Sequence, residues 1–203
     1  MAPLKLGFLA SHGGSNLQAI VDACKGGMLD GQARVVISNS SRAGARTRAE
    51  REGIPFYHLS SVTHADPAAL DAAILAALQT HGVEVVCLAG YMKKLGARTL
   101  AAYRGRILNI HPALLPKFGG RGMYGMRVHE AVLAAGEKES GATVHLIDGE
   151  YDHGPVLAQE KVPVYAGDTP ELLQARVLLV EHRLYAATLQ KIAAGDIALA
   201  DFY

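Results

Sequence analysis

An amide and an imidazole stand two residues apart in the segment 108–112, Leu-Asn-Ile-His-Pro, at the end of an apolar run. Residues two apart on a strand face the same way, so we expect Asn109 and His111 to project together. Pro112 disfavours helix for His111 and ends the strand where open parallel sheets hold their ligands. An amide donor beside an imidazole can stabilise the oxyanion that forms during attack on a carbonyl. The alternative is that both side chains only hydrogen-bond the loop that follows.

The acidic loop 148–154, Asp-Gly-Glu-Tyr-Asp-His-Gly, lies between two apolar stretches. Asp148, Glu150 and Asp152 resemble the oxygen ligands of a calcium loop, but the loop is too short for an EF-hand and lacks its terminal Glu. A carboxylate partner for His111 is the better use of this loop, because such a neighbour favours imidazolium and can accept or relay a proton. A solvated hairpin turn is the alternative.

Two glycines begin a third candidate site. Gly13 and Gly14 let backbone amides approach a ligand closely, and the helix that follows Ser15 and Asn16 places its positive end there. The loop therefore predicts an anion site that a phosphate would fit. The pattern is neither the Walker motif nor the full dinucleotide fingerprint, since the third glycine and a suitable acidic residue are missing. A glycine turn capped by Ser15 or Asn16 is the alternative.

Three other side chains indicate packing rather than chemistry. His145 lies two residues after Thr143 on an expected strand, which favours a site-lining or buried polar residue over a metal ligand. Cys24 and Cys87 are too few for a disulfide scaffold and lack a zinc spacing. Both lie on apolar stretches, so we expect buried, unreactive thiols.

Strands and helices alternate through the first half of the chain. The expected strands are short apolar runs at 4–10, 33–38, 56–59, 83–89 and 106–111. The expected helices follow the glycine loop as far as Cys24 and then cover 45–52, 67–80 and 96–103. Asp66 and Pro67 form a good N-cap and first-turn pair for the third helix. The alternation predicts an α/β fold with a doubly wound, mostly parallel sheet covered on both faces.

The pattern changes past Pro116, where a glycine-rich excursion occupies 119–125. The elements expected after it are a helix at 128–135, strands of mixed direction at 142–147 and 155–164, and a long amphipathic helix from Asp168-Thr169-Pro170-Glu171 to about Ala194. The apolar positions of this last helix that are available to the core are Leu172, Leu173, Val177, Val180, Leu184 and Leu189.

The length of 203 residues, against a prior of ~150 residues per domain, predicts a single domain over 1–203. Half of the residues are apolar and 19% are charged, which excludes extended disorder. A net charge of +1 lacks the basic excess that binds nucleic acid or acidic lipid, so we expect neither partner. No apolar run reaches the ~18–20 residues that span a bilayer, and no secretory signal is visible, so we expect a cytoplasmic protein.

Three segments, in this order and at these separations, closely resemble the phosphoribosylglycinamide formyltransferase family of purine synthesis. They are 14–20 (Gly-Ser-Asn-Leu-Gln-Ala-Ile), 108–116 (Leu-Asn-Ile-His-Pro-Ala-Leu-Leu-Pro) and the loop of Asp152. The Asn-Ile-His-Pro segment is shared by the wider 10-formyltetrahydrofolate-dependent formyltransferases, whereas the glycine-Ser-Asn loop is characteristic of the glycinamide enzymes. The resemblance covers nearly the whole chain and implies their Rossmann-like fold.

The resemblance implies transfer of a formyl group from 10-formyltetrahydrofolate, a co-substrate, to the amine of 5-phosphoribosylglycinamide in de novo purine (IMP) biosynthesis, with no metal. It implies a catalytic trio in which Asn109 and protonated His111 stabilise the oxyanion of a tetrahedral intermediate, while Asp152 holds His111 charged. It also implies that 13–16 hold the ribose phosphate and that Glu181 lies near the glycinamide end.

The resemblance also implies that two segments border the folate pteridine. They are Tyr91, Met92, Lys93, Lys94 and Leu95, and Asp148, Gly149, Glu150 and Tyr151. The stretch 118–126 is longer and more glycine-rich than in much of the family, and Pro67 stands about where some members have an arginine facing the folate tail. The role of the glycine-rich stretch and the recognition of that tail are left open.

Two other functions fit the same residues. A formyltetrahydrofolate hydrolase would use the trio with water as the nucleophile, although that family normally adds an N-terminal regulatory domain. In a non-catalytic nucleotide-binding module, the Gly13 loop would bind phosphate and the trio would be structural. For the enzyme we expect small-molecule substrates and a monomer or homodimer, and a turnover assay separates the enzymes from the binding module.

Overall fold

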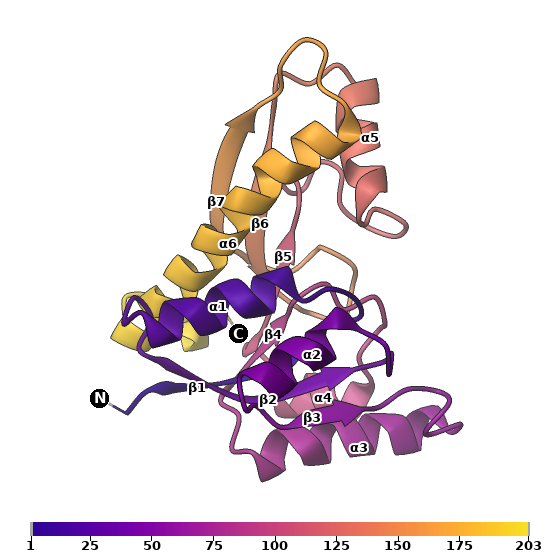
Figure 1. Cartoon of the computed structure of the whole chain (residues 1–203), viewed down its shortest axis with the longest axis vertical. Coiled ribbons are helices and arrows are strands. Elements are labelled where there is room, and N and C mark those ends of the chain that lie inside the picture. The colour runs from indigo at the N-terminus through magenta and orange to yellow at the C-terminus, as the bar shows by residue number, and fades with distance from the viewer. Residues whose placement is uncertain (1, 203) are drawn as a thin grey trace.

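The protein's structure, a computed structural model, describes residues 2–202, which form one seven-stranded sheet flanked by helices (Figure 1). The strands are β1 (Leu4–Leu9), β2 (Gly31–Ser38), β3 (Phe56–His58), β4 (Val85–Leu88), β5 (Ile107–His111), β6 (Glu139–Leu146) and β7 (Val156–Pro163). The helices are α1 (Ser15–Lys25), α2 (Gly44–Arg51), α3 (Pro67–Thr80), α4 (Ala97–Ala102), α5 (Met126–Ala134) and α6 (Pro170–Ala194), followed by the 3-10 helix η1 (Leu199–Phe202). Every expected strand and helix is present, with ends that differ by a few residues.

The sheet has the strand order β3-β2-β1-β4-β5-β6-β7. The strands β1 to β5 run parallel to their neighbours, whereas β6 and β7 are antiparallel to theirs. The prediction of a doubly wound, mostly parallel sheet with C-terminal strands of mixed direction is therefore confirmed. The order turns back at β1, which has β2 on one side and β4 on the other, and open α/β sheets bind their ligands outside the C-terminal ends of strands at such a point.

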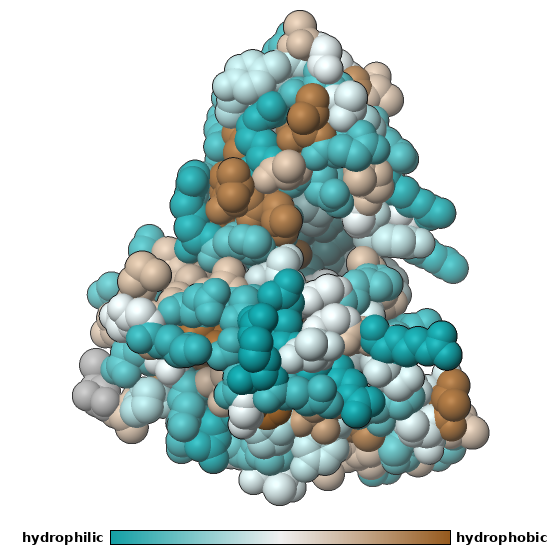
Figure 2. Space-filling view, viewed as in Figure 1, coloured by the Kyte–Doolittle hydropathy of each residue, from teal (hydrophilic) through white to brown (hydrophobic). Residues whose placement is uncertain are grey.

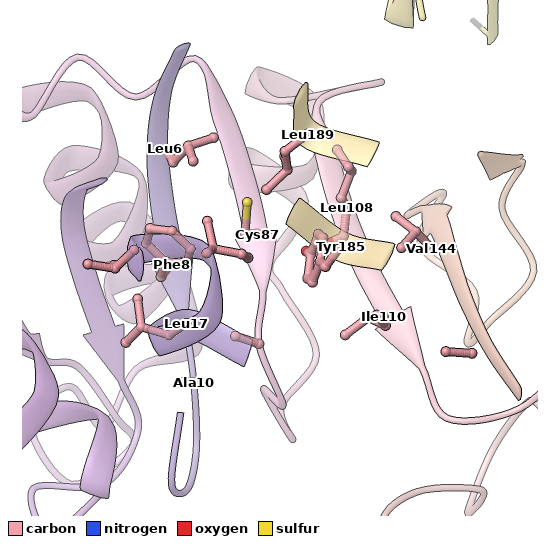
Figure 3. Close-up of a cluster of buried hydrophobic side chains, with 14 of the residues drawn as sticks. Leu6, Phe8, Ala10, Leu17, Cys87, Leu108, Ile110, Val144, Tyr185 and Leu189 are labelled. Carbon is pink, nitrogen blue, oxygen red and sulfur yellow. The ribbon is translucent and has the colours of Figure 1, made fainter. Parts of the chain in front are cut away.

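Two apolar layers cover the sheet, one on each face. On one face, Leu6 of β1 and Leu108 of β5 pack with residues of α1 and α6 (Figures 1 and 3). The buried Tyr185 of α6 donates its hydroxyl to the Leu108 carbonyl at 2.9 Å. On the other face, Leu9 of β1 packs with Leu78 of α3. Because side chains alternate along β5, Leu108 belongs to the first layer and the residues beside it in sequence face the other way.

Side-chain caps fix two of the helix starts that the sequence predicts. The Asp66 carboxylate accepts the backbone N–H groups of Ala68 and Ala69 at 3.1 and 3.2 Å at the start of α3. The Thr169 hydroxyl accepts the N–H of Leu172 at 3.3 Å at the start of α6. Each cap satisfies amides that have no partner inside the helix, so the cap residues decide where these helices begin.

One expectation about the core of α6 is wrong. Leu172 is 55% exposed, whereas Leu173, Val177 and Val180 are buried. The buried stripe follows positions i, i+4 and i+7 from Leu173, and Leu172 lies one residue outside it. Leu184 is only partly buried and packs against the same layer.

Both cysteines have thiols that resist ionisation. Cys87 on β4 is fully buried, and burial raises the pKa of its thiol. Cys24 on α1 is only partly buried. Burial is nevertheless the main cause that raises the pKa of its thiol to about 11. The expectation of unreactive thiols fits both, but that of full burial holds for Cys87 alone. As for membranes, none of the helices within residues 2–202 is long and apolar enough to cross one.

Candidate active site

A cavity of about 650 Å³ opens where the parallel strands β1, β4 and β5 end. Figure 2 shows the molecule hollowed between its broad lower part and the narrower upper part. Almost all of the predicted site residues line this cavity: Gly13, Gly14, Ser15, Asn16, Tyr91, Met92, Lys93, Lys94, Leu95, Asn109, His111, Gly149, Glu150, Tyr151, Asp152 and Glu181. Segments far apart in the sequence therefore meet at one place, the switch point of the sheet.

Asp148 is the predicted site residue that does not line the cavity. Its carboxylate accepts the N–H of Glu150 at 3.0 Å and lies 2.8 Å from Nδ1 of His153. Burial alone would raise the pKa of Asp148, but the hydrogen bonds from His153 and Glu150 hold it below its ordinary value. These contacts use the carboxylate to shape the loop that carries its neighbours into the cavity wall.

The end of β5 and the acidic loop bring Asn109, His111 and Asp152 together. Nδ1 of His111 lies 3.5 Å from Oδ2 of Asp152, whose side chain is 12% exposed. Oδ1 of the same carboxylate lies 3.6 Å from Nε2 of His145, and that nitrogen is 3.1 Å from the amide nitrogen of Asn109. Asp152 thus sits between two imidazoles, which the alternative of a solvated hairpin turn does not describe.

Burial and the neighbouring acceptors act on the pKa of His111 in opposite directions. Burial lowers the pKa of His111, and this effect exceeds the opposing effects of the Asp152 carboxylate and the Phe118 carbonyl. Nε2 donates to that carbonyl at 2.7 Å, because a carbonyl oxygen only accepts. The expectation that Asp152 holds His111 charged stays a prediction: Asp152 raises the pKa of His111, but in this conformation burial of a ring that is 3% exposed outweighs that effect.

Asp152 keeps its charge in spite of its burial. Burial alone would raise the pKa of Asp152, but the neighbouring rings of His145 and His111 and the N–H of Gly120 together hold it below its ordinary value. The Gly120 N–H lies 2.9 Å from Oδ2. The carboxylate is therefore available as an acceptor or a proton relay at neutral pH.

The glycine-rich excursion, whose role the sequence left open, closes over the cluster. Phe118 offers its carbonyl to His111 while adopting a φ of 56°, a left-handed conformation that is uncommon for a bulky residue. A Cβ at Gly119 would lie 2.5 Å from the end of the Leu115 side chain and 3.2 Å from the Cβ of Asp152, so a larger residue there would displace one of these side chains. The excursion therefore positions both His111 and Asp152.

His145 orients the amide of Asn109. Nδ1 of His145 lies 3.0 Å from the carbonyl of Leu146, which only accepts, so Nδ1 carries a proton, while Nε2 lies 3.1 Å from the amide nitrogen of Asn109. The amide nitrogen of Asn109 is thereby turned toward His145 and keeps a second N–H. His145 is fully buried, in agreement with the prediction of a buried polar residue.

The loop at the start of α1 leaves its first turn without a side-chain cap. Gly14 is the N-cap, with a φ of 70° that glycine adopts without strain, and no side chain accepts from the first turn. The alternative of a turn capped by Ser15 or Asn16 is therefore wrong. Asn16 instead donates its amide to Glu181 at 2.7 Å. An uncapped helix start that lines a cavity suits an anion.

Glu181 lies in an environment that opposes its ionisation. Burial raises the pKa of Glu181 to about 7, although the hydrogen bond from Asn16 lowers it. Oδ1 of Asn16 is buried and finds no hydrogen-bond partner within residues 2–202. The pair can therefore receive a donor group from a ligand, such as a hydroxyl or an amine, at the end of the cavity beside the glycine loop.

Comparison with known proteins decides the family. Residues 4–189 match the family model described as formyl transferase. The chain belongs to this family. It is 39% identical over 191 residues to the phosphoribosylglycinamide formyltransferase of Escherichia coli, covering 94% of this chain and 88% of that protein. The solved structure of glycinamide ribonucleotide transformylase 1 from Symbiobacterium toebii superposes with a TM-score of 0.90 at 40% identity, covering 97% of this chain and 91% of that one.

Two plant members of the formyl transferase family are longer than this chain. The chloroplastic phosphoribosylglycinamide formyltransferases of Vigna unguiculata and Arabidopsis thaliana are each 42% identical to it and match 95% of it. This chain spans 62% and 66% of their lengths.

His129 on α5 is a cavity residue that sequence reasoning missed. Its side chain is 1% exposed, and burial, followed by the nearby His111, lowers its pKa to about 4. The buried Nδ1 finds no hydrogen-bond partner in the described part of the chain. The sequence signal was a histidine beside Val128 on the buried side of a short helix, a pattern that equally indicates a packed core residue.

The two segments expected to border the folate meet across the cavity mouth. Nζ of Lys94 lies 5.8 Å from the centre of the Tyr151 ring. The N–H of Met92 donates to the buried hydroxyl of Ser11 at 2.8 Å, which ties this segment to the end of β1. Burial raises the pKa of Tyr91 to about 12, so its hydroxyl stays neutral. Within residues 2–202, no three His, Cys, Asp or Glu side chains are grouped so that they could hold a metal ion.

Proposed function

We propose that this member of the formyl transferase family transfers the formyl group of 10-formyltetrahydrofolate to the amine of 5-phosphoribosylglycinamide in purine synthesis. One observation carries the proposal: a single cavity joins the cluster of Asn109, His111 and Asp152 to the uncapped helix start at Gly14. The cluster suits attack on a carbonyl, and the helix start suits a phosphate. Relatives named phosphoribosylglycinamide formyltransferase, which match nearly the whole chain, support it.

The proposed reaction forms a C–N bond between the glycinamide amine and the formyl carbon, and it breaks the bond from that carbon to N10 of the folate. The formyl oxygen carries negative charge in the tetrahedral intermediate. The second amide N–H of Asn109 and the ring of His111 donate to it. The proton lost by the attacking amine reaches the departing N10, with Asp152 as a relay through water.

His111 must change its partners to take this role. In the described conformation Nε2 donates to the carbonyl of Phe118. Negative charge growing on the formyl oxygen favours the protonated ring, because it adds to the effect of Asp152 and opposes that of burial. We therefore propose that the segment of Phe118 moves when both substrates are bound, so that Nε2 donates to the formyl oxygen while Nδ1 donates to Asp152.

Hydrolysis of formyltetrahydrofolate is the second candidate function. A formyltetrahydrofolate deformylase from Pseudomonas syringae is 27% identical, with a TM-score of 0.85, and covers 98% of this chain and 64% of that one. The same three side chains could activate a water molecule. The uncapped start of α1 favours the transferase, because a hydrolase has no phosphorylated acceptor to hold.

The two candidates differ in their need for the acceptor. The transferase is expected to form tetrahydrofolate and the formylated glycinamide in equal amounts, and only when phosphoribosylglycinamide is present. Tetrahydrofolate formation at the same rate without the acceptor would replace the proposal with hydrolysis. Absence of turnover by protein that still binds folate would leave a binding module.

We further propose that residues 1–203 act as one formyltransferase domain. The apolar layer that contains Leu6 of β1 also contains Val144 of β6 and Leu189 of α6, so both halves of the chain share one core. The expected monomer or homodimer and the expected cytoplasmic location stay predictions, and the plant relatives are named as chloroplastic.

A further inference from the structure

Three consecutive carbonyl groups of the glycine loop accept hydrogen bonds from residues that do not line the cavity. The carbonyl of His12 accepts the backbone N–H of Ala45, in the first turn of α2, at 3.1 Å. The carbonyl of Gly13 accepts Nε of Arg48, one turn further along α2, at 2.7 Å. The carbonyl of Gly14 accepts the N–H of Gln18 in α1 at 3.0 Å. Each of the three loop carbonyls therefore has a hydrogen-bond donor.

The opposite edge of the same peptides faces the cavity. In a trans peptide, the C=O of one residue and the N–H of the next point in opposite directions. Because the carbonyls of His12, Gly13 and Gly14 are held by α2 and α1, the N–H groups of Gly13, Gly14 and Ser15 are turned the other way. These residues line the cavity, and α1 has no side-chain cap. Successive amides aimed at one place select an anion.

We propose that Arg48 is a positioning residue that makes the cavity selective for a phosphorylated substrate, an inference that rests on the proposed function. The Gly13–Gly14 peptide lies between two glycines, so its rotation meets little steric resistance. Loss of the Arg48 donor lets the Gly13 carbonyl turn toward the cavity. A carbonyl oxygen in place of the Gly14 N–H repels a phosphate, whereas the folate end of the cavity is unaffected.

The Arg48 guanidinium lies among groups of α1, α2 and α6. Its Nη1 lies 3.4 Å from Oε1 of Gln18 on α1, and the same oxygen accepts Nη2 of Arg51 at 2.6 Å. Gln18 in turn donates to Glu52 at 3.0 Å. On α6, burial and then the charge of Arg48 lower the pKa of His182, so the guanidinium lies close to that ring. The arginine is therefore a fixed donor rather than a mobile surface charge.

The close packing of α2 against the glycine loop also supports a positioning role for Arg48. A Cβ at Gly44 would lie 3.2 Å from Cα of Gly13, and a Cβ at Gly14 would lie 3.0 Å from that of Ala45. This close approach holds the start of α2 against the loop on the side of the Gly13 carbonyl. The side-chain donor is thus the part of this clamp that a substitution can remove without rebuilding the backbone.

Arg48→Met tests the proposal, with Arg46→Met as the matched control. Both residues lie on α2, but Arg46 pairs with Glu50 at 2.8 Å and has no hydrogen bond to the loop. The first measurement is binding of ribose 5-phosphate and of ribose by calorimetry, which requires no turnover. The second is the KM of each substrate, together with kcat and the melting temperature.

Arg48→Met is expected to weaken ribose 5-phosphate binding and raise the KM of phosphoribosylglycinamide by about tenfold, the size expected for one charge-assisted hydrogen bond. The KM of the folate, the kcat and the binding of ribose should stay within about twofold, and Arg46→Met should match the wild type. Arg48→Lys, which keeps a charged donor, should recover most of the loss. Such a split between the two substrates does not follow from a general loss of stability.

Two results would overturn the role of Arg48. One is phosphate-ligand binding by Arg48→Met within twofold of the wild type. The other is an equal loss for ribose 5-phosphate and for the folate in Arg48→Met and Arg48→Lys, which would mark a folding defect. Failure of the proposed function looks different: the wild type would bind ribose 5-phosphate in a manner that depends on Arg48 but would form no formylated product.

Discussion

His111 combines opposing influences on a single ring. Its Nε2 donates to a carbonyl and its Nδ1 faces a carboxylate at 3.5 Å, and both surroundings favour two protons on the ring. Burial opposes the charge and prevails, so the pKa of His111 lies below its ordinary value. A ring balanced in this way gains a proton when a further negative charge arises beside it. Formation of an oxyanion supplies such a charge, so stabilisation is strongest in the transition state.

Asp152→Asn tests this balance at the level of one atom. The amide keeps the shape of the carboxylate but removes the charge that favours protonated His111. We expect kcat to fall by roughly 10²–10⁴, the range for a lost acid–base group, while the KM of each substrate changes little. Steady-state kinetics of the purified variant measure both quantities.

Asp148→Asn is the control for Asp152→Asn. Asp148 lies four residues before Asp152 in the same loop and interacts with Glu150 and His153 rather than with His111. Its kcat should stay within a few-fold of the wild type. Equal losses in the two variants would mean that the loop only needs its carboxylates for shape, and His111 would then depend on other groups.

At the scale of elements, two aspartates cap helices from different environments. Asp66 is exposed and caps α3 through two amides. Asp71 is 6% exposed and caps α4 from the neighbouring helix: it accepts the N–H groups of Arg98 and Thr99 at 2.8 and 3.1 Å and the Thr99 hydroxyl at 2.6 Å. The segment before α4 forms the Tyr91–Leu95 wall of the cavity, so the buried cap supports the site as well as the helix.

Replacing each cap by alanine should separate exposed from buried capping. Asp66→Ala is expected to lower the free energy of unfolding by about 1 kcal/mol, the usual value for an exposed N-cap. Asp71→Ala should cost roughly two to three times as much, because it leaves several buried donors without a partner. Urea unfolding measures both changes, provided that the m value, the slope of unfolding free energy against urea concentration, is the same in each variant. Equal costs for the two variants would show that water reaches the start of α4.

The elements were predictable because their signals are local. Asp66 followed by proline, or Gly82 before an apolar run, marks a boundary without reference to the rest of the chain. The cluster of Asn109, His111 and Asp152 was predictable in part, since strand alternation fixes the first two but only the family resemblance selected Asp152 from three carboxylates.

The contacts that tune the site could not be predicted, because they join residues that no local pattern relates. Arg48 reaches the Gly13 carbonyl across 35 residues of sequence, and Asp152 reaches the N–H of Gly120 across 32. The protonation of His111 depends on how much water the fold removes, which the sequence does not express. His129 was missed for the same reason.

At the scale of the whole molecule, burial of titratable groups in the cavity links stability to pH. In the folded protein the pKa of His129 is about 4, below its ordinary value of 6.5, so the ring stays neutral until the pH falls to about 4. Glu181 has the opposite sign, because burial raises its pKa to about 7 and the folded state holds a proton that the unfolded state releases. The two groups thus act in opposite directions between about pH 4 and 7: His129 costs stability as pH falls from 6.5 to 4, and Glu181 costs stability as pH rises from 4.5 to 7.

The contribution of His129 can be isolated by substitution. Between about pH 6.5 and 4 the unfolded chain binds a proton at this histidine that the folded chain does not, so the contribution of His129 lowers the free energy of unfolding as pH decreases through this range. His129→Gln removes this titration, so its unfolding free energy should fall less, or rise more, than that of the wild type as pH decreases through this range. The exposed His153 is the control: its pKa is raised by the hydrogen bond and charge of Asp148, so its contribution is constant below 6.5 and fades only above it. His153→Gln should therefore run parallel to the wild type between pH 6.5 and 4. Urea midpoints measured across the range decide the matter, and a His129→Gln curve parallel to the wild type would mean that His129 gains its proton in the folded cavity as readily as in water.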